Sequence, residues 1–479
     1  MLRDGAAPTG ARHTGPDVLD APKSRLPGFY KRPLDDRRAV VGRLANLDDA
    51  DVRALSPDGG LVPEIADHMV ENAIGVLALP LGVATNFVVD GEAVLVPMAV
   101  EEPSVVAACS HIAGLAERGG GFTTDVDPPI MIGQIQIVDV DDTDAARARI
   151  LAASDALLRD ADRLCPGLVE RGGGARGLEV RVLPPLTAGP HHDHDDDAPM
   201  LVVHVLVDCR DAMGANAINT VVEGIAPTVE ELSGGRVCLR ILSNLADRRL
   251  ARARMEIPFD ALAPKGPHTD DAGRGVARAI VDAYRFAARD PYRACTHNKG
   301  ILNGIDAAAI ATGNDWRAIE AGAHAFAAKD GRYTSLTTYA VDDARRVLVG
   351  TIELPMAVGT VGGATRVHPT VKAARKLLGR FAESAERLAG VLAAVGLAQN
   401  CGALKALATE GIQRGHMSLH ARQVALAVGA TGDEVDRVAA ALVDESCFRP
   451  ARAEEILIGL RPTSIGREAK STGDAEVAT

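Results

Sequence analysis

The stretch Ile130-Met131-Ile132-Gly133-Gln134-Ile135-Gln136-Ile137-Val138 decides the fold prediction. From Gly133 to Ile137 polar and non-polar positions alternate, which is the pattern of a strand with one buried face. The sequence before Pro129 has a different pattern of polar and apolar residues. We therefore predict that this strand opens a new domain.

The segments that follow complete a known order of elements. Thr143 to Val169 has apolar residues at helical spacing, and three consecutive glycines from Gly172 are expected to end the helix. Further strands are predicted at Leu178 to Leu183, Met200 to Cys209 and Arg236 to Leu242, with a helix from Gly214 to Leu232. The order β-α-β-β-α-β is the ferredoxin-like arrangement, carried here by about 115 residues.

The rest of the chain is predicted to be mainly helical. Helices are expected at Ala272 to Ala288, Asp315 to Ala328, Pro369 to Val395, Cys401 to Glu410, Leu419 to Val428 and Asp433 to Leu442, and a hairpin at Tyr333 to Val341 and Arg346 to Leu354. The fold class is thus α+β, with a helical large domain, an inserted ferredoxin-like small domain and a C-terminal helical flap. The predicted boundaries are a disordered tail at 1–22, the large domain at 23–128 and 246–410, the small domain at 129–245, the flap at 411–462 and a disordered tail at 463–479.

Composition limits the partners of the chain. Its 479 residues are enough for two or three domains. A formal net charge of -12 argues against a nucleic-acid partner, because binding phosphates requires a basic face. Seven scattered cysteines without a C-x-x-C pair suggest neither a disulfide framework nor a zinc site, so reduced thiols in a cytoplasm fit best. The apolar stretch Ala73 to Ala84 is well short of the roughly 20 residues that span a bilayer, so no membrane segment is expected.

Three motifs resemble binding sites but occur in the wrong context. Residues 172–177, GGGARG, spell G-x-G-x-x-G, yet a helix precedes them and a strand follows, the reverse of a dinucleotide fingerprint. The loop His191 to Asp197 contains metal-ligand side chains but looks like a solvated hairpin loop. His416 and His420 have the spacing of zinc proteases without the intervening glutamate. No metal site is predicted.

Four stretches place polar residues in apolar or glycine-rich surroundings: Glu101 to Ser104, Thr296 to Gly300, Thr312 to Trp316, and Arg414 to Met417. Each alone is compatible with an ordinary helix cap or a structural histidine. Together with other stretches in the same order from about Asp67 to Arg437, they resemble 3-hydroxy-3-methylglutaryl-CoA (HMG-CoA) reductases, especially the soluble bacterial class II type. These other stretches are Glu71 to Gly75, Asp208 to Asn216, Ile241 to Asn244, Asp290 to Ile305, Gly359 to Ala364 and Gly396 to Arg422.

The resemblance implies a fold, a reaction and site residues. The small domain would bind NADH or NADPH, and the enzyme would reversibly reduce HMG-CoA to mevalonate and CoA with two hydrides. The implied catalytic residues are Glu102, Lys299, Asp315 and His416; the substrate-binding residues are Ser104, Arg293, Asn303 and Asn400; and the cofactor-binding residues are Asp211, Met213, Gly214, Asn216 and Asn244.

These roles agree with the chemistry of the residue types. Lys299 would stabilise the oxyanion that develops at the thioester carbonyl, with Asp315 holding it in place. Glu102 would protonate the aldehyde oxygen in the second reduction, and His416 the departing CoA thiolate. Arg293 would bind the free carboxylate of the substrate.

Coenzyme choice and assembly follow less directly from the resemblance. Some NADH-using relatives carry an acid that repels a 2′-phosphate, but Cys165 aligns there, so NADH is only slightly favoured over NADPH. The family is dimeric, with active sites across the subunit interface, so self-association as a homodimer or higher even oligomer is expected.

Two alternatives remain open. The first is a catalytically inactive acyl-CoA-binding protein of the same fold. The second is a thiol-based acyl-CoA hydrolase using Cys295 and His297, although side chains at i and i+2 on a helix do not face each other.

Overall fold

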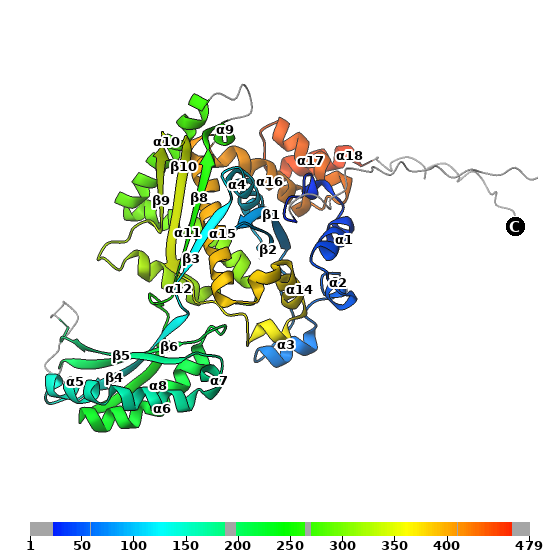
Figure 1. Cartoon of the computed structure of the whole chain (residues 1–479). Coiled ribbons are helices and arrows are strands. Elements are labelled where there is room, and N and C mark those ends of the chain that lie inside the picture. The colour runs from blue at the N-terminus through cyan, green and yellow to red at the C-terminus, as the bar shows by residue number, and fades with distance from the viewer. Residues whose placement is uncertain (1–22, 58, 187–197, 264–269, 410, 462–479) are drawn as a thin grey trace, which may run out of the picture. The chain divides into compact units, whose positions relative to one another are not determined.

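The structure is a computed structural model that describes residues 23–57, 59–186, 198–263, 270–409 and 411–461. It divides into two compact units, and the boundary in the chain falls between Ala408 and Thr409. The first unit contains two sheets and most of the helices, and the second is a group of three helices (Figure 1). The predicted α+β fold class is confirmed.

The small domain is the predicted ferredoxin-like unit. Its strands and helices are β4 Ile130–Val138, α5 Thr143–Ala152, α6 Ser154–Leu164, α7 Pro166–Val169, β5 Gly174–Leu183, β6 Met200–Asp208, α8 Ala215–Ser233 and β7 Arg236–Ser243. All neighbouring strands are antiparallel, in the order β5-β6-β4-β7. Helices α5, α6 and α8 cover one face of this sheet (Figure 1), and their apolar side chains form one core with it.

Gly133 explains how a helix packs closely on the central strand. A Cβ at this position would lie 2.4 Å from Val222 and 2.8 Å from Ile218, both on α8. The absence of a side chain therefore lets α8 approach β4.

The predicted helix from Thr143 to Val169 is three helices instead of one. Helix α5 ends at Ala152, because the backbone leaves helical geometry at Ala153, and α6 ends at Leu164. Pro166 then starts α7, because a proline has no N–H to continue the hydrogen bonds of the preceding helix.

The large domain contains a six-stranded sheet, of which the sequence predicted only one hairpin. The strands are β1 Leu81–Val89, β2 Glu92–Ala99, β3 Phe122–Val126, β8 Leu250–Pro258, β9 Thr337–Asp342 and β10 Val347–Pro355, in the order β2-β1-β3-β8-β10-β9. The predicted hairpin is β9–β10, which forms one edge of the sheet. The small domain is inserted between β3 and β8, which are paired neighbours, so its two connections run side by side.

Helices surround this sheet. They are η2 Phe29–Lys31, α1 Leu34–Leu44, α2 Asp49–Ala54, α3 Pro63–Met69, α4 Val105–Glu117, α9 Phe259–Leu262, α10 Asp270–Arg289, α11 Pro291–Ala311, α12 Trp316–Ala327, α13 Ala364–Val367, α14 Pro369–Leu377, η3 Gly379–Ala382 and α15 Ala385–Ala408. The predicted helix Pro369 to Val395 is wrong, because Gly379 with φ 54° separates α14 from α15. Helix α15 also includes most of the predicted helix Cys401 to Glu410; Glu410 itself lies outside the described residues.

Helix α15 is the central helix of the large domain. Among the described helices it is the one that is long and apolar enough to cross a membrane, and 67% of its most apolar window is buried inside the protein. It packs against α11, α4 and the strands β3 and β8. This burial is that of a core helix.

The second unit consists of α16 Ile412–Ala427, α17 Asp433–Asp444 and α18 Pro450–Leu460. Its small core is built around Val424, Val438, Leu442 and Leu457. The sequence predicted the first two helices and missed α18.

Candidate active site

A lysine and a glutamate from distant parts of the chain meet at the surface of the large domain. Lys299 lies on α11, and its Nζ is 3.5 Å from Oε2 of Glu102, in the turn between β2 and α4. The side chains are 61% and 37% exposed, respectively, so a substrate can reach both. Ser104, in the same turn, has a left-handed backbone with φ 80° and begins α4 without capping it through its side chain. Its hydroxyl is therefore not used by the helix that it precedes.

The turn from α11 to α12 contains the third predicted catalytic residue. Gly313 has φ 72°, which ends α11, and Asp315 caps α12 by accepting hydrogen bonds from the amides of Arg317 and Ala318 at 3.1 and 3.2 Å. Its carboxylate also pairs with the Arg317 guanidinium at 3.1 Å and is 39% exposed. Within the described residues no ion pair joins Asp315 to Lys299. The predicted coupling of these two residues stays a prediction.

Three of the four predicted substrate residues lie on the helices around Lys299. Arg293 is half-buried on α11, and burial lowers the pKa of its guanidinium. Asn303 is half-buried one turn beyond Lys299, on the same side of α11. Asn400 on α15 is fully buried, and its amide oxygen accepts hydrogen bonds from the hydroxyls of Thr337 and Tyr339 at 3.0 and 2.9 Å.

The predicted cofactor residues gather where the small domain joins the large domain. Asp211 accepts a hydrogen bond from the amide of Ala385, the first residue of α15, and its carbonyl accepts one from the amide of Thr360. The carbonyl of Asn244 touches α12, because a Cβ on Gly322 would lie 2.7 Å from it.

Gly214 and Asn216 stand at the start of α8. Gly214 has φ 103°, and a Cβ there would lie 2.4 Å from the Cys209 sulfur, so only glycine fits. No side chain caps this end of the helix. Asn216 is exposed in the first turn of α8.

Asn314 connects the catalytic helices to this junction. Its amide oxygen accepts a hydrogen bond from the amide of Gly359 at 2.8 Å, and the next residue, Thr360, donates to Asp211 at 2.8 Å. A side chain on Gly359 would collide with the backbone of Met213 at 2.5 Å. The end of α11 is thus tied to the predicted cofactor loop by two adjacent backbone amides.

Arg249 is a residue of this junction that sequence reasoning missed. It is 2% exposed, and its guanidinium donates to the carbonyls of Ala212 and Met213, both at 3.3 Å, and of Val358. Burial lowers the pKa of Arg249 to about 10, and the neighbouring Cys209 and then Glu386 oppose this shift only partly. In the sequence it lies among other arginines, and no neighbouring residue distinguishes it from an arginine exposed to solvent.

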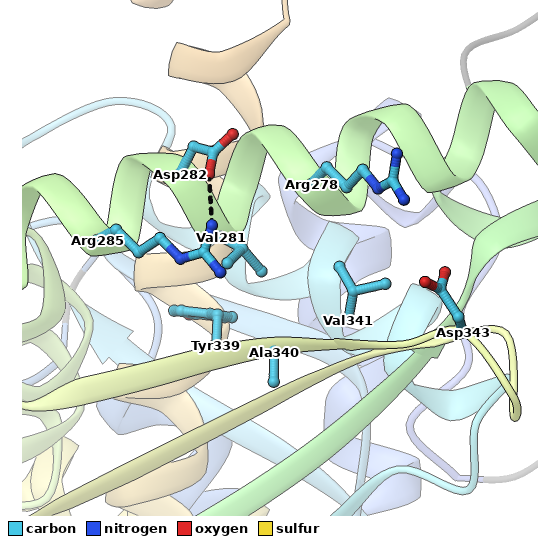
Figure 2. A pocket seen from close by; sticks show the side chains of 8 residues that line it. All are labelled: Arg278, Val281, Asp282, Arg285, Tyr339, Ala340, Val341 and Asp343. Carbon is cyan, nitrogen blue, oxygen red and sulfur yellow. Dashed lines mark hydrogen bonds and ion pairs between the residues drawn. The ribbon is translucent and has the colours of Figure 1, made fainter.

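A pocket of about 350 Å³ lies between α10 and β9 (Figure 2). Its lining residues are Arg278, Val281, Asp282, Arg285, Tyr339, Ala340, Val341 and Asp343. Arg285 pairs with Asp282 at 3.0 Å, as Figure 2 shows, and Asp343 pairs with Arg274 at 2.6 Å, so these charges are balanced within the protein. The pocket contains none of the predicted site residues, although Tyr339 donates its hydroxyl to Asn400.

The structure does not describe two of the regions singled out in the sequence, and it contradicts the alternative of a hydrolase. The side chain of His416, on α16, and the loop His191 to Asp197 lie outside the described residues. Among the residues that are described, no group of three or more His, Cys, Asp or Glu side chains has the arrangement of a metal site. A hydrolase using Cys295 and His297 is incompatible with the geometry, because Cys295 is exposed whereas His297 is buried and bonded to Thr337 and Ser335.

Comparisons with known proteins show which family the chain belongs to. The sequence model of hydroxymethylglutaryl-coenzyme A reductase matches residues 33–421. The 3-hydroxy-3-methylglutaryl-coenzyme A reductase of Archaeoglobus fulgidus is 51% identical, over 93% of this chain and 96% of the relative. A probable enzyme of the same name from Borreliella burgdorferi is 33% identical, over 74% and 77% of the two chains.

Solved structures give the same result. The 3-hydroxy-3-methylglutaryl-coenzyme A reductase of Streptococcus pneumoniae superposes with a TM-score of 0.75 at 42% identity, covering 91% of this chain and 99% of that one. A class II structure from the same organism, bound to NADPH in open conformations, superposes with a TM-score of 0.74 over 80% and 99% of the two chains. These matches define the class of protein as an oxidoreductase. The chain belongs to the hydroxymethylglutaryl-coenzyme A reductase family.

Proposed function

We propose that this chain interconverts HMG-CoA and mevalonate at the site around Lys299 and Glu102. The observation that carries the proposal is the 3.5 Å approach of Lys299 Nζ to Glu102 Oε2 in an exposed position. It places a fixed cation and a proton-exchanging carboxyl side by side, which is what the reduction of a thioester and then of an aldehyde requires. An inactive binding protein of the same fold is not supported, since the relatives that match are reductases.

Each predicted residue has a distinct task in this scheme. Lys299 holds its ammonium against the carbonyl oxygen of the substrate while negative charge develops on it, and Glu102 supplies a proton to the oxygen of the aldehyde. Arg293 and Ser104 hold the substrate carboxylate and chain, with Asn303 and Asn400. Asp315 supports Lys299, and His416 protonates the departing thiolate.

The dinucleotide fits the junction at the start of α8. The first amides of this 19-residue helix have no side-chain cap, which suits a pyrophosphate. Asp211, Met213 and Asn216 lie within three positions of Gly214 in the chain, and Asn244 directly follows β7. When bound, NADH or NADPH supplies the hydride for each reduction.

We further propose that both coenzymes are accepted, with NADH slightly preferred. The preference is only slight, because Cys165 stands where some NADH-using relatives carry an acid; its buried thiol lies 3.3 Å from the carbonyl of Ala161 and does not repel a 2′-phosphate. The free state of all seven cysteines supports a cytoplasmic location.

We also propose that the chain functions as a homodimer or a higher even oligomer. The extended segment 70–79 exposes several large apolar side chains, with Ile74 104% and Leu77 90% exposed. Contiguous exposed apolar residues of this kind mark interaction surfaces. A second copy of the chain is the partner that the family resemblance implies.

The test of the proposed reaction is its stoichiometry. Purified protein with HMG-CoA should oxidise two NADH or NADPH for each thioester consumed, and should release one free CoA thiol. Consumption of the thioester without oxidation of the coenzyme would indicate a hydrolase, and no consumption by folded protein would remove the proposal.

A further inference from the structure

A buried group of hydrogen-bonded side chains lies behind Lys299. His297, on α11, is 1% exposed, and its Nε2 lies 2.7 Å from Oγ1 of Thr337 and 2.8 Å from Oγ of Ser335. Thr337 donates to the amide oxygen of Asn400 at 3.0 Å, and so does the hydroxyl of Tyr339 at 2.9 Å. The group connects α11, the start of β9 and α15.

The orientation of the Asn400 amide follows from its third neighbour. The amide nitrogen faces the backbone carbonyl of His297 at 3.4 Å, and a carbonyl can only accept. The nitrogen must therefore be on that side, and the amide oxygen on the side of the two hydroxyls. Both lone pairs of this oxygen are then occupied, by Thr337 and Tyr339.

Counting donors and acceptors in the same way shows which ring nitrogen of His297 carries the hydrogen. The hydroxyl of Thr337 has one hydrogen, which it gives to Asn400, so its oxygen must accept from His297. Ser335 gives its own hydrogen to the carbonyl of Thr337 at 2.8 Å and is likewise an acceptor. The Nε2 of His297 consequently carries the hydrogen. Burial, and next the charge of Arg293, lower the pKa of His297 to about 3, so the ring is neutral and Nδ1 is an acceptor.

We propose that His297 is a positioning residue of the reductase site: its Nε2–H, through Thr337, fixes the amide of Asn400, which then offers its remaining N–H to the acyl substrate. This inference rests on the proposed function, in which Asn400 contacts the substrate. His297 itself stays buried and contacts neither substrate nor coenzyme. The atom Nδ1 has no hydrogen-bond partner within the described residues. The hydrogen bonds of His297 to other side chains are therefore made by Nε2.

A histidine that serves only the core would behave differently from a positioning histidine. Loss of a purely structural bond lowers stability and leaves the kinetic constants of the folded protein unchanged. Loss of the positioning bond frees the Asn400 amide and weakens binding of the acyl substrate alone, because the coenzyme residues are held by separate contacts at Asp211 and Arg249. The two roles are therefore separated by the KM values.

The test compares His297→Gln with His297→Asn. A glutamine places its amide nitrogen near the position of Nε2 and retains the donor, whereas an asparagine reaches only the position of Nδ1. We expect His297→Gln to keep the KM for HMG-CoA within about twofold and His297→Asn to raise it about tenfold, as for the loss of a buried hydrogen bond. The KM for NADH or NADPH should not change in either variant.

Thr337→Val provides a second route if His297→Asn does not fold. Valine has nearly the shape of threonine but cannot relay the hydrogen bond, so the same rise in the KM for HMG-CoA is expected. Combined with His297→Asn it should add nothing further, because both changes break one chain of bonds.

The outcomes distinguish the two proposals. A wild-type protein without reductase turnover overturns the proposed function and this inference with it. Wild-type turnover with an unchanged KM for HMG-CoA in folded Thr337→Val, or with equal changes in both KM values, overturns the positioning role alone.

Discussion

The ammonium of Lys299 lies 3.5 Å from the carboxyl of Glu102, although 197 positions separate the two residues in the chain. The contact joins α11 to the turn after β2, and both elements are held by the same large core. Because the two side chains remain partly exposed, the pair contributes little to stability. Its position is instead suited to a reaction in which charge develops on a bound carbonyl oxygen.

Lys299→Ala should remove turnover in both directions while leaving the fold intact. Loss of one group that stabilises an oxyanion costs about 10²- to 10³-fold in kcat, and a charged group costs at least as much. The measurement is kcat with HMG-CoA and with mevalonate, together with far-ultraviolet circular dichroism. Lys372→Ala, an exposed lysine on α14, is the control and should retain full activity. Retained turnover in Lys299→Ala would refute the role of this residue.

Arg249→Met should destabilise the junction of the two domains. Methionine leaves the carbonyls of Ala212, Met213 and Val358 without their donor, at a cost of about 2–4 kcal/mol in the free energy of unfolding. The KM for the coenzyme should rise as well, since the loop that follows Asp211 loses its anchor.

The adjacent Arg248→Met provides a matched control for Arg249→Met. Arg248 is exposed and pairs with Glu179, so its replacement should change stability by less than about 0.5 kcal/mol. Urea unfolding of both variants makes the comparison. Equal effects would show that the burial of Arg249 has no energetic consequence.

Leu77→Asp should weaken self-association without affecting the monomer fold, because this side chain is 90% exposed in the chain and a charge in a buried interface is costly. Light scattering coupled to size exclusion measures the mass of the particle. Leu239→Asp, at an exposed apolar position on β7, is the control and should leave the mass unchanged. A Leu77→Asp protein of unaltered mass would exclude the segment 70–79 from the interface.

Asp306 should make the stability of the protein depend on pH. Burial, and next the neighbouring Glu320, raise the pKa of Asp306 from 3.8 to about 8, and its Oδ1 has no hydrogen-bond partner among the described residues. The folded chain thus binds this proton more tightly than the unfolded chain. The stabilisation is complete below about pH 4 and is lost as the pH rises to about 8.

Asp306→Asn removes this titration. The variant should be more stable than the wild type at pH 8.5, by about 1 kcal/mol or more, with the difference shrinking toward pH 5. Urea unfolding at both pH values measures it, and Asp36→Asn, an exposed aspartate on α1, serves as the control. An unchanged pH dependence in Asp306→Asn would show that this carboxyl does not bind the proton more tightly in the folded chain.

The sequence predicted the small domain well because its strands carry a local signal. In β4 buried and half-buried positions alternate from Gly133 to Val138. Strand β6 is rich in β-branched residues, although five consecutive positions in it are buried, and the helices have apolar positions at regular spacing. The large sheet lacked this signal. Strand β2 is buried at six consecutive positions, so its apolar residues show no alternation, and such a run cannot be distinguished from other buried segments.

Helix α15 shows a second limit of sequence patterns. We predicted a break within it from Gly396 to Asn400, and a second glycine, Gly402, follows shortly after. Both glycines are helical, and a side chain would collide with Ile305 at Gly396 and crowd Ala108 at Gly402. Their purpose is close packing with α11 and α4, which only the three-dimensional structure reveals.

The candidate site was predicted from the family resemblance and not from periodicity. No spacing rule brings Glu102 to Lys299, and none identifies Arg249 as buried. The network of His297 also depends on contacts over 40 and 103 positions of the chain. Sequence patterns did not predict α11, the helix that carries Lys299, and the partners of that helix come from the tertiary structure.

The most direct test of the central claim is the absorbance of the reduced nicotinamide when purified protein is mixed with mevalonate, CoA and either NAD or NADP. We predict a rise that requires both mevalonate and CoA, with NAD slightly faster than NADP, and that is absent in Lys299→Ala. Folded wild-type protein that gives no rise with either coenzyme would contradict the assignment of this site as a hydroxymethylglutaryl-coenzyme A reductase.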